Sequence, residues 1–522
     1  MSLKLLRKEA LPYILCSSDR FQKPLLLLAC VYLPFLRKFA YNISMTSNRP
    51  WGFILRLFLA SILIGLLNLA PRSHSYHDAL DKARLALEHN DLTHAVGHIE
   101  EAAEETPWRT DLPLLAARYA LQSGNPHQAI QILEQPRVAS QLSPANLILL
   151  GDAYQQSGNV LMAAAIWQHV AKLSPSPEIY QRLASYHQAR RDFPAAIQDL
   201  HQLLQYNPAD ASLNYRLGLL YATQDPESGL AYLAQAAELD PSLASSALEL
   251  QRKIRTATLF DEPAYTFTAA GRVLAMLDEW NLAEAAFLKS VQLRPDYAEA
   301  WAFLGEARQH STSSISLKYP GLPDLQMALS LDPDSIAANL LMGLYCSRQG
   351  EYQLAGRYIQ TTISLEPDNP LLHAELANTL ALQGDLPAAQ AAYQHAITLA
   401  PDDPFFYRLL AEFSLAYHIQ IREIALPSAR TAVILSPQDP RALDVLAQAL
   451  LYLEDTLNAE RFLLQALEID PLYAPAHLHL GLVYLQRGEM ERGRQELDLA
   501  GTLGSNSRTA AQVQRFIDYY FP

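Results

Sequence analysis

The chain has 522 residues, 50% of them hydrophobic, and a formal net charge of −14. The charge is unevenly divided, because residues 1–72 carry ten Lys/Arg and two Asp/Glu, whereas residues 73–522 carry a net charge of −22. The net negative charge of residues 73–522, which we call the body, argues against a nucleic-acid partner, because binding to nucleic acid depends on cations that neutralise phosphates. Cys16, Cys30 and Cys346 are the three cysteines, so the body has one thiol and no internal disulfide.

The amino-terminal segment, residues 1–50, is basic. Its apolar run at 24–36 has thirteen residues, which is too short to cross a bilayer comfortably. Met45 offers an alternative translation start, in which case residues 1–44 would not be made. Either start leaves the next apolar run complete.

That next run, from Trp51 to Ala70, reads WGFILRLFLASILIGLLNLA and contains a single charge, Arg56. Twenty helical residues span about 30 Å, the thickness of the hydrocarbon core of a bilayer. We therefore predict a transmembrane helix over 51–70 that anchors the protein in a membrane. The alternative is a signal peptide cleaved after Ala70, which would make the protein secreted, but Pro71 directly after the cut disfavours cleavage.

The orientation of this anchor is predicted from the flanking charges. Eight Lys/Arg precede Trp51, which favours a cytoplasmic amino terminus and a single-pass topology. The repeat body described below would then lie outside the cytoplasm. Within twenty residues on either side, however, the basic residues are equal in number, three before and three after, so the topology depends on the longer count.

A proline recurs through the body at a nearly constant spacing. Six of the eight gaps between successive prolines are 33 to 36 residues, and the other two are 54 and 38. The prolines are Pro175, Pro208, Pro241, Pro295, Pro333, Pro367, Pro401, Pro437 and Pro471. Twelve residues before each of them, and before Pro107, stands an alanine or glycine: Ala95, Ala163, Ala196, Gly229, Ala283, Gly321, Ala355, Ala389, Ala425 or Ala459. A period near 34 is typical of helix-turn-helix arrays, and small residues fit where two helices cross closely.

One unit, residues 370–403, shows how each repeat is built. Apolar residues spaced by three and four predict a first helix, Gly384 and Asp385 predict its end and the start of a second helix, and Pro401 begins the link to the next unit. The residues Leu376, Ala377, Gly384, Ala389, Tyr393, Ala396 and Pro401 occupy the signature positions of the tetratricopeptide repeat family, which this unit resembles. The resemblance implies an all-α fold, a right-handed α-solenoid of about twelve helix-turn-helix units.

Two irregularities in the spacing divide the array. The gap of 54 predicts an extra helix and linker at 244–263, between a first lobe at 76–243 and a second lobe at 264–507. A Ser-rich run from His310 to Pro323 enlarges one turn, where a surface loop is expected. Residues 508–522 are expected to form a capping helix, because a repeat array must cover its last apolar face.

Motifs of catalysis and cofactor binding are absent from the sequence. It contains no phosphate loop, dinucleotide fingerprint, zinc-protease motif or nucleophile elbow, so we expect no enzyme activity, cofactor or metal. His94 and His98, at i and i+4, match one spacing used by metal ligands, and a metal-dependent enzyme built on them is the alternative from another class.

Binding is the expected activity. The resemblance implies that first helices line a concave groove for extended or helical peptides. In this register the groove would contain the polar residues Asn378, Arg408, Glu412, Gln448, Glu306 and Asp444. The paired lysines and asparagines with which chaperone-binding relatives hold a terminal carboxylate are missing.

The function that follows is a membrane-anchored, non-enzymatic scaffold that binds a protein or peptide partner in its concave groove. The alternative is a regulatory or substrate-presenting subunit of a cell-envelope enzyme complex, such as one that assembles polysaccharide. Cleavage after Ala70 would instead give a secreted repeat protein with the same groove.

Overall fold

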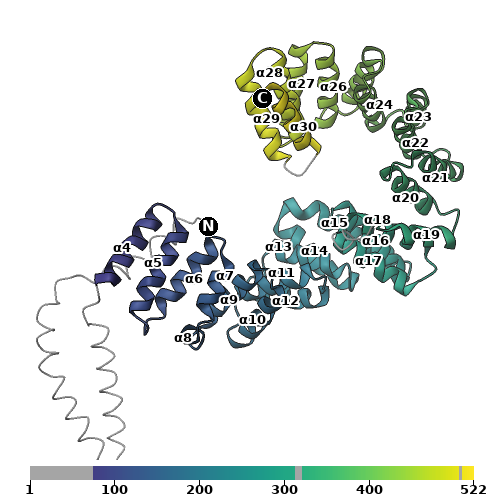
Figure 1. Ribbon diagram of the computed structural model, residues 1–522. Helices are drawn as coiled ribbons and strands as arrows, with labels where there is room; N and C mark the ends of the chain where they lie inside the picture. The colour runs from purple at the N-terminus through teal and green to yellow at the C-terminus, as the bar shows by residue number, and fades with distance from the viewer. Residues whose placement is uncertain (1–73, 312–319, 505–507, 522) are drawn as a thin grey trace, which may run out of the picture. The chain divides into compact units, whose positions relative to one another are not determined.

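The computed structural model describes residues 74–311, 320–504 and 508–521 (Figure 1). Over these residues the chain forms 27 α-helices and one π-helical segment, without strands. Twenty-four of the α-helices form twelve consecutive pairs, and α8, α15 and α30 stand outside the pairs. The all-α, paired helix-turn-helix architecture predicted from the proline spacing is therefore confirmed.

The expected anchor at 51–70 lies outside the described residues. Within the described part of the chain, no helix is both long enough and apolar enough to span a bilayer. The anchor thus stays a prediction.

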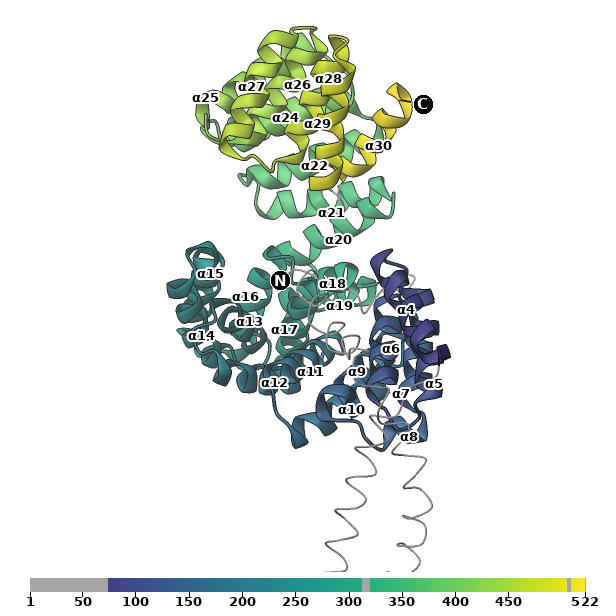
Figure 2. The same cartoon turned by 90° about the vertical axis from the view of Figure 1, so that its left-hand side faces the viewer.

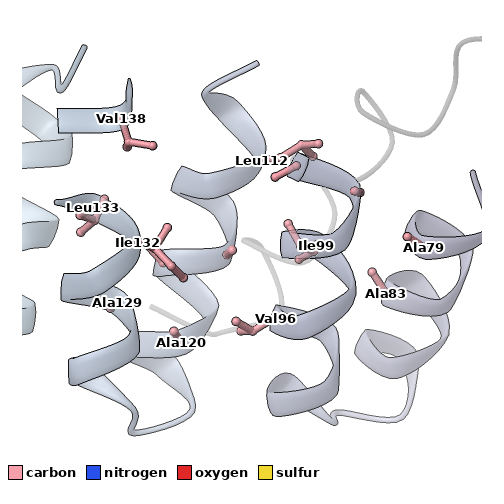
Figure 3. Close-up of a cluster of buried hydrophobic side chains, with 14 of the residues drawn as sticks. Ala79, Ala83, Val96, Ile99, Leu112, Ala120, Ala129, Ile132, Leu133 and Val138 are labelled. Atoms are coloured by element: carbon pink, nitrogen blue, oxygen red, sulfur yellow. The ribbon is translucent and has the colours of Figure 1, made fainter. Parts of the chain in front are cut away.

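The chain divides into two compact units between Pro208 and Ala209. The helices of the first unit are α4 (His74–Glu88), α5 (Leu92–Glu105), α6 (Asp111–Gln122), α7 (Pro126–Leu133), α8 (Pro136–Ala139), α9 (Pro144–Gln156), α10 (Val160–Leu173), α11 (Pro177–Ala189) and α12 (Phe193–Tyr206). Figure 3 shows the core of this unit, where side chains from α4, α5, α6 and α7 meet, among them Val96, Ile99, Leu112 and Ile132. Each helix thus buries its apolar face against its neighbours in the array.

The second unit begins with α13 (Ala211–Tyr221), α14 (Pro226–Leu239), α15 (Pro241–Thr258), α16 (Pro263–Met276), α17 (Trp280–Leu293), α18 (Ala298–His310), α19 (Leu322–Leu331), α20 (Ile336–Arg348) and α21 (Tyr352–Leu365). It continues with α22 (Pro370–Gln383), α23 (Leu386–Leu399), α24 (Pro404–Ala416), η3 (Ile421–Ala425), α25 (Leu426–Leu435), α26 (Pro440–Tyr452), α27 (Thr456–Ile469), α28 (Ala474–Gln486), α29 (Met490–Leu503) and α30 (Arg508–Tyr520). Helix α15 packs against α14 and α16. The division into lobes at 244–263 remains a prediction.

The pair α22–α23 shows how the sequence sets the helix ends. Pro370 begins α22, where its missing N–H costs nothing. Gly384 ends it in the left-handed conformation, at φ +89°, and the Asp385 side chain accepts a hydrogen bond from the Ala388 backbone N–H at 3.1 Å to start α23. Glycine is favoured at that dihedral because other residues suffer a clash of their Cβ. These are the roles that the sequence predicted for both residues.

The small residues before each proline lie at helix crossings, as expected. All ten are buried, and the eight alanines are fully inaccessible to solvent. The closest approach is at Gly321, where an added Cβ would stand 1.9 Å from the carbonyl oxygen of Gly305 on α18. A larger side chain at this position would force the two backbones apart.

The π-helical segment η3 was not predicted. It lies between α24 and α25, where the proline spacing is 36 residues instead of 34. In the preceding unit Ala389 lies five positions after Gly384, whereas Ala425 lies seven positions after His418, although both alanines are fully buried. The wider turn of a π-helix takes up the two extra residues, and His418 and Gln420 adopt positive φ values of 54° and 46° just before it.

The last helix, α30, packs against α28 and α29. Its Val513 is buried in the apolar cluster formed with Leu497 and Ala500, and Phe516 and Ile517 pack on the edge of the same cluster. The apolar face at the end of the repeats is thereby covered, which is what a terminal helix does in an array of this kind.

Candidate functional site

Five of the six expected groove residues lie on three successive first helices of the second unit. Asn378 is on α22, Arg408 and Glu412 are on α24, and Asp444 and Gln448 are on α26; we call these five residues the strip. Spacings of 34 and 36 residues place Asn378, Glu412 and Gln448 at the same point of their helices. Helix α24 contacts both α22 and α26, so the residues of the strip lie on three neighbouring helices, whose positions Figures 1 and 2 show.

The centre of the strip is an ion pair within α24. Arg408 Nη1 donates a hydrogen bond to Glu412 Oε1 at 2.5 Å, at the i and i+4 spacing that brings two side chains together. Burial raises the pKa of the Glu412 carboxyl, Arg408 opposes that rise, and the negative charge of Asp444 adds to it. The positive charge of Arg408, whose side chain is mostly buried, offsets part of the cost of ionising the Glu412 carboxyl.

The third helix of the strip carries a buried carboxylate. The side chain of Asp444 is only 3% exposed, its Oδ1 lies 2.6 Å from His479 Nδ1 on α28, and its Oδ2 accepts a hydrogen bond from Gln448 Nε2 at 3.1 Å. Asp444 therefore lies beneath the surface, where it fixes the orientation of Gln448. Gln448 itself remains partly exposed.

Three residues of this site were not among the expected ones. The Tyr393 hydroxyl, on α23, donates a hydrogen bond to Asn378 Oδ1 at 3.2 Å. Burial raises the pKa of Glu375, one turn before Asn378, while a hydrogen bond from Asn378 and the charge of Arg348 act against that rise. The sequence could have indicated Glu375, because it lies three residues before Asn378 and residues at that spacing share a helical face. It could not have indicated His479, because the bond of His479 to Asp444 depends on how α26 and α28 pack.

The sixth expected residue, Glu306, lies apart from the strip on α18. It accepts a hydrogen bond from Arg348 Nη2 on α20 at 2.5 Å, and His310 Nε2 lies 3.1 Å from its other oxygen. Burial disfavours ionisation of Glu306, but His310 and Arg348 outweigh it and lower the pKa of the carboxyl. Arg348 also acts on Glu375, so its charge links Glu306 to the edge of the strip.

The two histidines considered as metal ligands are each paired with a different carboxylate. His94 Nδ1 lies 2.7 Å from Asp91 Oδ2, and His98 Nδ1 lies 3.0 Å from Glu101 Oε2. Neither pair extends to a third ligand, because no group of three or more His, Cys, Asp or Glu able to hold a metal occurs among the described residues.

Comparison with known proteins finds a known repeat in three segments of the chain. Models of the tetratricopeptide repeat match residues 182–250, 347–413 and 445–507. No curated protein sequence matches the chain. Among solved structures, yeast Tom70 is 14% identical with a TM-score of 0.41, over 85% of this chain and 95% of Tom70.

Two further structures are similar over different lengths. The Cut9–Hcn1 hetero-tetramer of the APC/C is 15% identical with a TM-score of 0.39, over 88% of this chain and 98% of the matched one. MamA from Desulfovibrio magneticus RS-1 is 21% identical with a TM-score of 0.29, over 33% of this chain and 97% of MamA.

Proposed function

We propose that the chain is a membrane-tethered, non-enzymatic tetratricopeptide repeat scaffold that holds a protein or peptide partner on its first helices. Tetratricopeptide repeats bind protein or peptide partners and are typically non-catalytic. The partner would lie along the strip.

The observation that carries this proposal is that side chains of the strip have hydrogen-bond donors and acceptors that their contacts within the protein do not use. Asn378 is exposed and accepts one hydrogen bond from Tyr393, which leaves the second lone pair of Oδ1. Gln448 donates to Asp444, and its Oε1 has no partner among the described residues. Arg408 uses one of five N–H donors in its bond to Glu412. Amide and guanidinium groups at a regular spacing can pair with the backbone of an extended peptide.

Membrane tethering is proposed on the residues of the amino-terminal run alone. Twenty residues from Trp51 to Ala70 with one charge, Arg56, match the thickness of a bilayer, and Pro71 opposes cleavage. The excess of Lys/Arg before Trp51 supports placement of the repeat body outside the cytoplasm.

Carbonate extraction of native membranes tests the tether, and the protein should stay in the membrane fraction. A soluble form whose amino terminus lies near Pro71 would replace the tether by secretion. Protease added to spheroplasts should degrade the repeat body, and full protection would place the body in the cytoplasm.

The binding proposal is tested by site-specific photo-crosslinking in the full chain. A benzophenone amino acid at Asn378 should cross-link one defined partner in native membranes. The same group at Gln394, exposed on the second helix α23 of the same pair, is the matched control and should not cross-link that partner. Equal yields from both positions would mean that first helices have no special part in binding.

A further inference from the structure

A hollow lies among helices of the second unit that precede those of the strip in the chain. Helices α15, α16, α17, α18 and α20 surround this hollow of about 450 Å³, within the range of about 300–1,000 Å³ that is typical of ligand sites. Its principal lining residues are Lys253, Tyr265, Arg272, Met276, Trp280 and Phe303.

The hollow belongs to the same register as the expected groove. Arg272 lies 34 residues before Glu306, and Phe303 lies three residues before Glu306. Since α16, α18 and α20 are first helices, a peptide that lies along this face would pass over the hollow. Arg272 is thus a position that the repeat spacing could have identified.

The apolar part of the hollow combines fixed rings with one flexible side chain. Phe303 stacks on Phe287 with ring centroids 5.5 Å apart, and Phe287 is held against Gly271, where an added Cβ would stand 2.6 Å from its ring. Met276 is 69% exposed at the rim. Rigid rings with an exposed, adaptable methionine suit the insertion of a large apolar side chain.

The charged part of the hollow is cationic, although the body as a whole is acidic. The Arg272 guanidinium lies 4.9 Å from the centroid of the Phe303 ring, is 55% exposed, and approaches Glu299 at 3.3 Å. Lys253 makes no ion pair with any described residue. Glu306 is the one acidic residue among the described lining residues, and Arg348 already neutralises it.

We propose that this hollow binds an acidic peptide segment through one aromatic side chain. The ring would insert beside Phe303 and Met276, while a neighbouring Asp or Glu of the peptide pairs with Arg272 and Lys253. The argument is charge complementarity, because Lys253 makes no ion pair among the described residues and Arg272 makes only the exposed pair with Glu299, which solvent weakens, so both cations can attract an anionic partner. The inference builds on the proposed function, since it names the chemistry of the peptide that the first helices would hold.

The probe is a fluorescein-labelled peptide, capped at both ends, in which Asp-Phe-Glu is flanked by Gly and Ser. Fluorescence anisotropy with the full chain in detergent should show saturable binding. Matched peptides with Asn-Phe-Gln or Asp-Ala-Glu at the centre should bind about tenfold more weakly or worse, a loss of about 1.4 kcal/mol. Equal binding of all three peptides would overturn the proposal.

Two variants place the site on the protein. Arg272→Glu and Met276→Ser change exposed side chains, so the fold should persist, and each should weaken the Asp-Phe-Glu peptide about tenfold. Lys289→Glu reverses a charge at an exposed position of α17 outside the hollow and should leave binding unchanged. A loss with Lys289→Glu as large as with Arg272→Glu would reduce the effect to net charge and overturn the site.

The strip and the hollow are separated by Asn378→Ala. Loss of peptide binding in Asn378→Ala but not in Arg272→Glu would overturn the hollow and leave the proposed function intact. If the peptide does not bind, but a partner is cross-linked at Asn378, the hollow is likewise overturned and the proposed function stands. Self-association that Arg272→Glu abolishes, without peptide binding, would make a second copy of the chain the occupant and overturn the peptide proposal.

Discussion

His479 Nδ1 lies 2.6 Å from Asp444 Oδ1 and joins α28 to α26, two successive first helices. The two side chains are 15% and 3% exposed. Because a buried carboxylate is costly without partners, this bond fixes how the two helices stand against each other. The other carboxylate oxygen of Asp444 accepts a hydrogen bond from the Gln448 side-chain amide.

The first prediction concerns this pair. His479→Ala removes one of the two hydrogen-bond partners of the Asp444 carboxylate and should lower the free energy of unfolding by about 1–3 kcal/mol. Equilibrium denaturation followed by circular dichroism measures the change. In a double-mutant cycle with Asp444→Ala, the two losses should add to more than the loss in the double variant. Strict additivity would show that the two side chains do not interact.

The second prediction tests a helix crossing. Ala389 is completely inaccessible to solvent, so Ala389→Trp should overpack the crossing and cost about 3 kcal/mol or more. Ala391→Trp makes the same change at an exposed position two residues along α23 and should change stability by less than about 0.5 kcal/mol. Equal thermal midpoints for the two variants would contradict the proposed register of small residues.

The sequence predicted features of this fold that depend on a single residue type at a fixed spacing. Ala389 is fully buried and Gly384 has a left-handed backbone, because a helix crossing and a helix end each require a small residue, which repeats with the array. The segment η3 was not predicted, since two extra residues can be taken up by a loop as readily as by a π-helix. The bond between His479 and Asp444 could not be predicted from the sequence either. Neither residue recurs at the repeat spacing, and the distance between them depends on how α26 and α28 pack.

The third prediction concerns glycine at a helix end. Gly384 has φ +89° and no atom within 4 Å of an added Cβ, so Gly384→Ala should cost about 1–2 kcal/mol through backbone strain alone. Gly97 also has open space around an added Cβ but lies within the helix α5. Gly97→Ala should therefore stabilise the protein by about 0.5–1 kcal/mol. Thermal denaturation of the two variants should show shifts of opposite sign.

The last prediction is a dependence of stability on pH at the edge of the strip. Burial raises the pKa of Glu375 in the folded protein above its value in the unfolded chain, so the folded state binds the proton more readily. The cost of ionising Glu375 is therefore absent well below the unfolded pKa of about 4.3, grows as the pH rises, and is complete above the folded pKa.

Glu375→Gln removes this cost, because the amide has a similar shape and does not ionise. The free energy of unfolding of the variant minus that of the parent should therefore increase between pH 4 and pH 7, as measured by urea denaturation at both values. Glu468→Gln, the same chemical change at an exposed position of α27, gives the background to subtract. A difference for Glu375→Gln that stays constant, or that falls as the pH rises, would mean that burial does not govern this carboxyl.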